Sequence, residues 1–115
     1  MRFEIDTNTV GQYIWRFVAA NNRILANGEA YTAKHNVLHC INLVKGTTSL
    51  AQYTFYRDVQ GHWRWTLFAT NREIIAQSSE SYWNEADARS AAQIVVSTNA
   101  STPVLDLTAR KAVGY

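Results

Sequence analysis

The amino-acid sequence predicts an α+β domain built from two tandem β-β-β-α-β repeats. The repeats are expected to share one antiparallel sheet, with two helices packed on one of its faces. Two observations lead to this prediction. The segment at residues 63–78, WRWTLFATNREIIAQS, echoes IWRFVAANNRILANG at residues 14–28. Within each copy the apolar period changes from two to nearly four, which is typical of strands followed by a helix.

The two copies of the repeat cover most of the 115 residues. Trp15 aligns with Trp65 at an offset of fifty. One additional residue in the second copy then aligns Tyr31 with Tyr82. A single copy would have a small core and open sheet edges, so the two copies are expected to bury a common apolar face. We therefore expect one domain over residues 1–115, with repeat one at 3–52, repeat two at 53–108 and a tail at 109–115.

Three strands are predicted at the start of each copy. The first, at residues 3–6 or 53–56, precedes a turn that ends at Gly11 or Gly61. The next two are expected to form a hairpin around a two-residue turn, Asn21–Asn22 or Asn71–Arg72, although Arg72 suits a left-handed backbone less well than asparagine. The side chains expected to face the core are Tyr13, Trp15, Phe17, Ala19, Ile24 and Ala26, with Trp63, Trp65, Leu67, Ala69, Ile74 and Ala76 in the second copy.

A helix is predicted after the hairpin of each copy, at residues 33–45 and Glu85–Val96. Asn84 is the expected N-cap of the second helix. A short extended segment, at residues 49–52 or 103–108, follows each helix and is expected to be the last strand of the copy. The apolar helix faces are Val37, Cys40, Ile41 and Val44, then Ala88, Ala91, Ala92 and Val95.

The chain resembles the YegP-like family of unknown function. The stretches that carry the resemblance are GQYIWRFVAANNRILANGEAY and GHWRWTLFATNREIIAQSSESY, each followed by a helix. The usual Asn-Gly turn of the family is absent, and its Gly-Ile helix motif is replaced by Cys40-Ile41 and Ala91-Ala92. The resemblance implies one continuous sheet with the C-terminal strands exchanged between repeats, so that residues 104–107 join the first repeat. It implies no activity.

Composition and charge argue against several classes of protein. Eleven basic and nine acidic residues give a net charge of +2, and the basic residues are scattered rather than clustered as in a dedicated nucleic-acid or membrane binder. The single cysteine excludes an internal disulfide and suits a reducing compartment. No signal peptide is visible, and no apolar run approaches the ~20 residues of a membrane helix. We expect a soluble, cytoplasmic protein without membrane contact.

No catalytic constellation is found, so we predict that the protein is not an enzyme and holds no cofactor. His35 and His39 have the i, i+4 spacing of two metal ligands and are weak candidates for a metal site. The third ligand such a site needs is missing, because Cys40 lies about 100° further around the helix and points toward the core. Cys40 is expected to be a small buried side chain.

The outer face of the sheet is the candidate binding surface. In the predicted register Val18 pairs with Leu25 and Phe68 pairs with Ile75, which places two apolar spots on a face that also carries arginines. Such spots mark a contact surface, or they are covered by the tail 109–115 or by sheet curvature. The predicted surface consists of Arg16, Val18, Leu25, Arg64, Phe68 and Ile75.

The function that follows is a non-enzymatic binding or scaffold module with a protein partner or with itself. One alternative is binding of single-stranded nucleic acid through Arg16, Arg64 and exposed aromatic residues of the same face, which stack on unpaired bases. A weaker alternative is a metal-dependent protein that uses His35 and His39.

Overall fold

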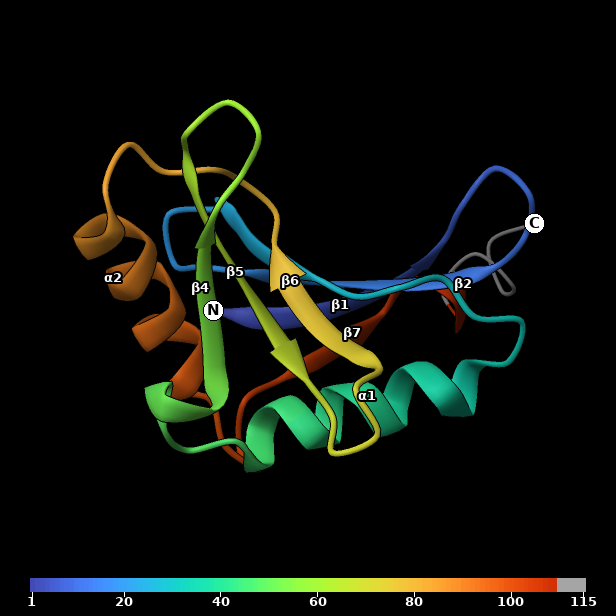
Figure 1. Ribbon diagram of the computed structural model, residues 1–115. Helices are drawn as coiled ribbons and strands as arrows, with labels where there is room; N and C mark the ends of the chain where they lie inside the picture. The colour runs from blue at the N-terminus through green and yellow to red at the C-terminus, as the bar shows by residue number, and fades with distance from the viewer. Residues whose placement is uncertain (110–115) are drawn as a thin grey trace.

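The computed structural model describes residues 1–109, which form one mixed seven-stranded sheet with two helices on one face (Figure 1). The α+β class and the single sheet are as predicted. The elements, in chain order, are β1 (Arg2–Thr7), β2 (Tyr13–Val18), β3 (Ile24–Asn27), α1 (Lys34–Gly46), the 3-10 turn η1 (Leu50–Gln52), β4 (Tyr53–Arg57), β5 (Trp63–Phe68), β6 (Ile74–Ser78), α2 (Glu85–Val96) and β7 (Val104–Asp106).

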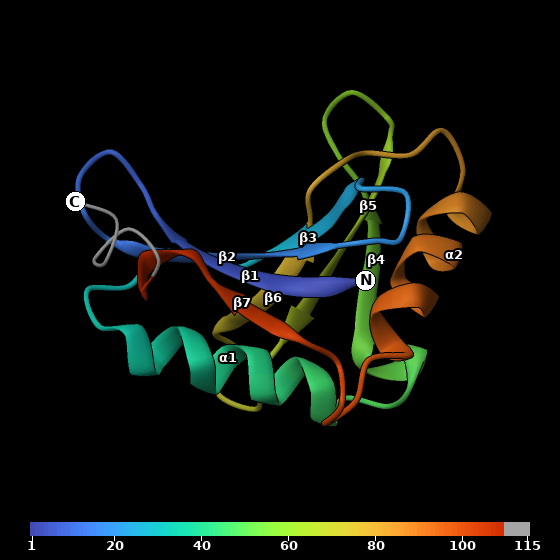
Figure 2. The same ribbon diagram turned by 180° about the vertical axis from the view of Figure 1, so that it is seen from behind.

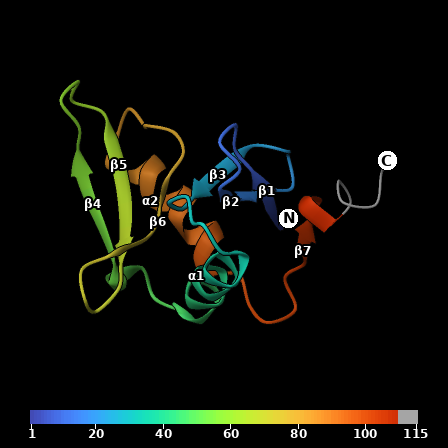
Figure 3. The same ribbon diagram turned by 90° about the vertical axis from the view of Figure 1, so that its right-hand side faces the viewer.

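The two repeats meet at the centre of the sheet. The strand order is β4-β5-β6-β3-β2-β1-β7, and β3 pairs antiparallel with β6. At this junction Asn27 lies opposite Gln77, the residue fifty positions later. The arrangement therefore has an approximate two-fold axis at this pair, and β4 and β7 lie at opposite ends of the sheet (Figure 3).

The last strand is exchanged, as the family resemblance implies, but in one direction only. Strand β7 leaves the second repeat and pairs with β1 of the first (Figure 2). This pairing is parallel, so the sheet is mixed and not wholly antiparallel as predicted. The first repeat has no corresponding strand, because its predicted extended segment at residues 49–52 contains η1, whose N-cap Ser49 accepts a hydrogen bond from the Ala51 amide. The chain after α1 then leads directly into β4.

Both helices pack on the core face and bridge the two repeats. Helix α1 contacts β2 and β6, and α2 contacts β3, β4 and β5. Their buried residues are the eight that the helical period predicts, and the Asn84 side chain caps α2 by accepting a hydrogen bond from the Asp87 amide at 2.8 Å. The largest fully buried side chains are Trp15, Trp65, Phe3 and Phe17. Each stabilises the fold by roughly 1.5–3 kcal/mol through burial.

The hairpin turns are one residue longer than predicted. The Ala19 amide donates to the Arg23 carbonyl at 2.9 Å, which closes a three-residue loop with Asn22 in the left-handed region at φ 66°. Phe17 nevertheless pairs with Ala26 as predicted, because a β-bulge next to Val18 restores the register. The second hairpin has the same geometry. The Ala69 amide donates to the Glu73 carbonyl, Arg72 has the left-handed backbone, and Leu67 pairs with Ala76.

The bulges reverse the faces of four side chains. Val18 pairs with Ile24 and Phe68 pairs with Ile74, so the predicted pairs with Leu25 and Ile75 are wrong. Leu25 and Ile75 become the additional residues of the bulges and point into the core, with 5% and 6% of their surface exposed. Ile24 and Ile74, both predicted to face the core, instead pair with Val18 and Phe68 of the outer face, and Ile24 is 41% exposed.

No helix within residues 1–109 is both long enough and apolar enough to cross a membrane. Of the predicted tail at 109–115, the structure describes only Ala109. Cover of the outer face by residues 110–115 therefore lies outside the described residues.

Candidate functional site

The sheet face opposite the helices carries a row of paired residues that runs across all seven strands. These residues are polar except for one leucine at the end of the row. Since side chains alternate along each strand, the row lies on the face away from Trp15 and Trp65. We call it the polar row: Thr54, Thr66, Gln77, Asn27, Arg16, Glu4 and Leu105.

The half of the polar row that belongs to the first repeat is charged. Glu4 is only 7% exposed and accepts hydrogen bonds from Arg16 Nε at 2.7 Å and Arg2 Nε at 2.8 Å. Arg16 Nη2 lies 3.5 Å from Asp6 Oδ2. Burial opposes ionisation of Glu4, but the hydrogen bonds from the two arginines outweigh it and hold the pKa below its usual value. The predicted site residue Arg16 is therefore fixed within this cluster.

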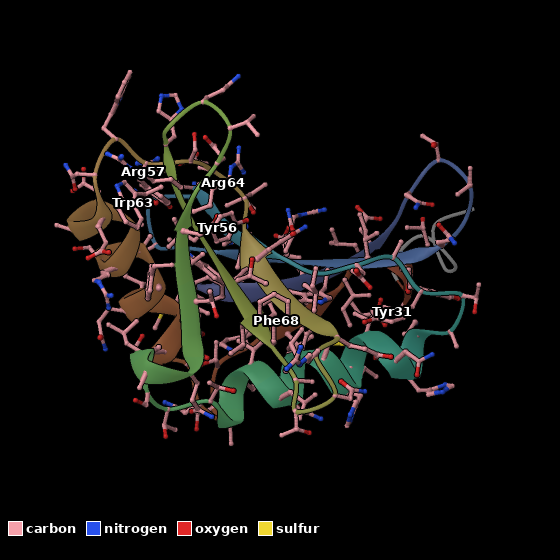
Figure 4. The ribbon with its side chains drawn as sticks, viewed as in Figure 1. Tyr31, Tyr56, Arg57, Trp63, Arg64 and Phe68 are labelled. Atoms are coloured by element: carbon pink, nitrogen blue, oxygen red, sulfur yellow. The ribbon has the colours of Figure 1, made fainter. Side chains whose placement is uncertain are left out.

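The half that belongs to the second repeat is neutral and is flanked by exposed aromatic side chains. Tyr56 pairs directly with Arg64 across β4 and β5, and Phe68 lies on the same face of β5 (Figure 4). We call these three residues the aromatic strip. Tyr56 is 39% exposed, Phe68 is 44% exposed and the Arg64 side chain is 37% exposed. Between them lie Thr54 and Thr66 of the polar row.

Arg64 of the aromatic strip is held in place by the turn between β4 and β5. Its Nε donates to Asp58 Oδ2 at 2.9 Å. The other oxygen of Asp58 accepts hydrogen bonds from the Gln60 and His62 amides, both at 3.0 Å. The hydrogen bond from Arg64 lowers the pKa of Asp58, and the two backbone amides act in the same direction. The guanidinium is thus fixed at the edge of the strip and partly neutralised.

A groove of about 540 Å³ opens over the junction of the two repeats. Asn27 and Gln77 of the polar row line it, together with the aliphatic side chains of Ile14 and Ile24. Asn27 Nδ2 donates to Ser79 Oγ at 3.2 Å. Asn27 Oδ1 is buried and has no hydrogen-bond partner within the described part of the chain. A buried acceptor in this state is uncommon and costly.

The indole of Trp15 forms another part of the groove. Its Nε1 is also buried without a hydrogen-bond partner among residues 1–109. Gly28 lies against this nitrogen so closely that a Cβ at this position would be only 2.1 Å from it. A glycine is therefore required where the chain passes over the indole, and the groove has a rigid wall at this point.

The structure divides the predicted binding surface. Arg16, Arg64 and Phe68 lie on the outer face as expected. Leu25 and Ile75 are core residues and cannot form part of an exposed surface, and Val18 is only 4% exposed. The physical reason is the bulge in each hairpin, which a two-residue turn would not require.

Sequence reasoning missed Tyr56, Asn27 and Gln77 on this face. Strict alternation in YTFYR at Tyr53–Arg57 is a signal that could have identified Tyr56 as an outward residue. The positions of Asn27 and Gln77 could be inferred only from the pairing of β3 with β6, because that contact joins residues fifty positions apart.

The histidine pair acquires no further ligand. In residues 1–109 there is no group of three histidine, cysteine or acidic side chains that could hold a metal ion. Cys40 is buried, as predicted, and its Sγ lies 3.3 Å from the Tyr31 hydroxyl. This hydrogen bond and partial burial both raise the pKa of Tyr31.

Comparison with solved structures identifies the same fold in two proteins studied by solution NMR. The UPF0339 protein SO3888 from Shewanella oneidensis superposes with a TM-score of 0.82 at 22% identity, over 92% of this chain and 90% of that one. YegP from E. coli, described as a protein of unknown function, superposes with a TM-score of 0.82 at 24% identity, over 91% and 90%. At these identities the likeness establishes the fold.

Sequence comparison identifies relatives that correspond to one repeat. The UPF0339 protein NMB1088 from Neisseria meningitidis serogroup B is 49% identical over 49 residues, which are 43% of this chain and 88% of that protein. The UPF0339 protein NMA1193/NMA1859 from serogroup A gives the same values. The model of the domain of unknown function DUF1508 matches twice, at residues 8–53 and 58–106. The chain therefore belongs to the DUF1508 family and carries two tandem copies of its domain.

Proposed function

We propose that this protein is a non-enzymatic binding module that contacts another protein, or a second copy of itself, through the outer face of the sheet. The observation that carries the proposal is the aromatic strip, in which Tyr56, Arg64 and Phe68 are exposed on one face of two paired strands. Tyrosine and arginine are enriched among the residues that dominate binding energies, and phenylalanine is enriched at interfaces generally.

The aromatic strip is suited to high-affinity binding because it is rigid and because it exposes apolar area. The sheet holds the backbone of β4 and β5, and the bond to Asp58 holds the Arg64 side chain. A partner therefore loses little affinity to the ordering of these groups. Phe68 and its cross-strand neighbour Ile74 also provide apolar area that a partner can bury.

The groove at the repeat junction supports the same proposal. It is lined by Asn27 and Gln77 of the polar row and by the aliphatic side chains of Ile14 and Ile24. We infer that a partner places polar groups beside the amides of Asn27 and Gln77 and apolar side chains on the strip.

Affinity capture with a matched control tests the proposal. The baits are the wild type, Phe68→Glu and Val59→Glu, the last of which places the same charge on a fully exposed turn residue. We expect a partner that is retained by the wild type and Val59→Glu and lost with Phe68→Glu. Sedimentation velocity of the same three proteins detects self-association. Capture and self-association that are equal for all three would contradict the proposal.

Binding of single-stranded nucleic acid is the second candidate, because the strip combines two exposed aromatic rings with an arginine. Stacking on such rings contributes about 1–3 kcal/mol for each base. The arginines weigh against it, since Arg64 is paired with Asp58 and Arg16 is paired with Glu4 and Asp6. We therefore expect no salt-dependent change in the fluorescence anisotropy of a mixed-sequence oligonucleotide. Salt-dependent binding that Phe68→Glu abolishes would favour this second function.

The proposal includes a cytoplasmic location. It is supported by Cys40, which is the single cysteine of the chain and a free, buried thiol. Proteins of oxidising compartments more often use cysteines in disulfides.

A further inference from the structure

The two outer edges of the sheet are unequal although the repeats are related by an approximate two-fold axis. Beyond β1 the sheet continues into β7, which pairs with it at Phe3, Glu4 and Ile5. Strand β4 is the counterpart of β1, yet it ends the sheet at the other side and pairs only with β5 among the described strands (Figure 3). The position that corresponds to β7 beside β4 is thus not filled by residues 1–109.

The connection after α1 explains this inequality. The segment after α2 reaches the far edge of the first repeat and forms β7 there. The segment after α1 likewise leads to the outer edge of the second repeat. There it continues directly into β4, which is the first strand of that repeat. In a symmetric arrangement the edge of the second repeat would have two strands, β4 and a counterpart of β7. The chain after α1 supplies only β4.

We propose that the free edge of β4 is a strand-addition site for an extended peptide segment of a partner protein. The segment runs parallel to β4 and takes the place that β7 takes beside β1. Strand addition of this kind obtains affinity from main-chain hydrogen bonds and specificity from alternate side chains. The site is separate from the outer face, so it adds a second contact to the proposed binding function.

The backbone of β4 defines where the segment can bind. The Phe3 amide points toward β7 and donates to the Pro103 carbonyl at 2.9 Å. Alternate residues of a strand direct their backbone groups to the same side, so the counterparts of Phe3 and Ile5, which are Tyr53 and Phe55, face the free edge. The Tyr53 amide already donates to the Leu50 carbonyl of η1. The segment therefore pairs with the Tyr53 carbonyl and with both backbone groups of Phe55.

The side chains around β7 indicate the chemistry of the segment. Val104 packs against the core, and Asp106 accepts a hydrogen bond at 2.8 Å from Lys34, the first residue of α1. The first residue of α2 is Glu85, so the charge at the equivalent place is reversed. Glu85 pairs with Arg89 at 3.2 Å, and the Arg89 guanidinium lies 4.3 Å from the centre of the Phe55 ring, but both side chains of the pair are about half exposed, and such a pair is weak. The structure thus favours a segment with an aliphatic residue followed, two positions later, by a basic one.

A second copy of the chain fits the edge less well. A two-fold dimer formed through β4 pairs the two strands antiparallel, whereas β7 on β1 provides a parallel template. The partner segment is therefore the occupant that the strand direction favours.

Two synthetic peptides test the proposal. TPVLDLT reproduces residues 102–108, and TPVLKLT carries lysine at the position of Asp106. We expect TPVLKLT to shift the amide resonances of Phe55 and Arg57, and a spin label at its N-terminus to broaden the Tyr53 end of β4 more than the Arg57 end. Its affinity should exceed that of TPVLDLT by about two- to fivefold, the range expected for one exposed ion pair.

Variants of α2 and β5 provide the controls. Glu85→Lys should reverse the preference between the two peptides, whereas Asp87→Lys, with the same change of charge on the same helix turn, should leave it unchanged. Phe68→Glu should bind TPVLKLT like the wild type, which separates this site from the outer face. The proposal is overturned if the peptides perturb β1 instead of β4, if the label reports antiparallel binding, or if Glu85→Lys does not change the preference. A dimer that pairs through β4 and excludes the peptides would also overturn it.

Discussion

Asn27 and Gln77 lie opposite each other at the junction of β3 and β6, and they hold the same position in the two repeats. Within residues 1–109, β3 and β6 form one other residue pair, Ala26 with Ser78, and the Ser79 amide donates to the Leu25 carbonyl at 3.2 Å. So short a ladder contributes few hydrogen bonds. The two repeats are therefore held together mainly by their shared core and by the two helices, each of which contacts strands of both repeats.

Replacement of the glycine beside this junction should destabilise the fold. A Cβ on Gly28 would lie 2.1 Å from Trp15 Nε1, and the indole is fully buried and cannot move aside freely. We expect Gly28→Ala to lower the free energy of unfolding by about 1–3 kcal/mol, as overpacking does. The matched control is Gly46→Ala, where a Cβ meets no atom within 4 Å. Equal urea midpoints for the two variants would show that the indole does adapt.

The bulge in the first hairpin makes opposite predictions for two adjacent residues. Leu25 is a buried core residue and Ile24 is 41% exposed. We expect Leu25→Ala to lower the free energy of unfolding by about 2–4 kcal/mol and Ile24→Ala to change it by less than about 1 kcal/mol. Chemical denaturation measures both values. A two-residue turn without the bulge would reverse this order.

The left-handed turn residues should respond unequally to glycine. Asn22 and Arg72 occupy the same turn position at φ 66° and 68°, and arginine tolerates this conformation less well than asparagine. We expect Arg72→Gly to raise the free energy of unfolding by about 0.5–1 kcal/mol and Asn22→Gly to raise it less, because glycine adopts this conformation without strain. Thr70→Gly, in the same turn but with an ordinary backbone, should not stabilise. A gain at Thr70 that matches the gain at Arg72 would point to a different cause.

The attachment of β7 should weaken in acid. Burial opposes ionisation of Asp106, but hydrogen bonds from Lys34 and Thr108 outweigh it and lower the pKa to about 2. Because the pKa is lower in the folded state, the stabilisation is complete above about pH 5 and is lost as the pH falls through 2. Since the pair is partly exposed, we expect Asp106→Asn to lower the free energy of unfolding by only about 1 kcal/mol at pH 7, and the difference from the wild type to become much smaller as the pH falls to 2.

Urea titrations of the wild type and Asp106→Asn at pH 7, 4 and 2 measure this effect. In a Lys34→Met background the difference at pH 7 should become smaller, because the carboxylate has lost its charged partner. A difference that stays constant from pH 7 to pH 2 would mean that Asp106 acts through packing and not through its charge.

Much of the fold could be predicted because its signals are local. The helical period in NVLHCINLV and ADARSAAQIVV identifies the buried helix faces, and alternation around Trp15 and Trp65 identifies the strands. Of the candidate surface, Arg16, Arg64 and Phe68 could be placed for the same reason. Leu25 and Ile75 could not, because a bulge changes which face a residue joins without changing the sequence pattern on either side of it.

The sequence by itself determined the two repeats, their strands and helices, and the apolar faces that hold them together, since each depends on the spacing of side chains within a short segment. Only the tertiary structure decided the register of the hairpins, the parallel pairing of β7 with β1 and the free edge of β4. These features depend on contacts between residues far apart in the chain. Their energies arise from side-chain packing and strand pairing, which cannot be inferred from the spacing of residues within one short segment.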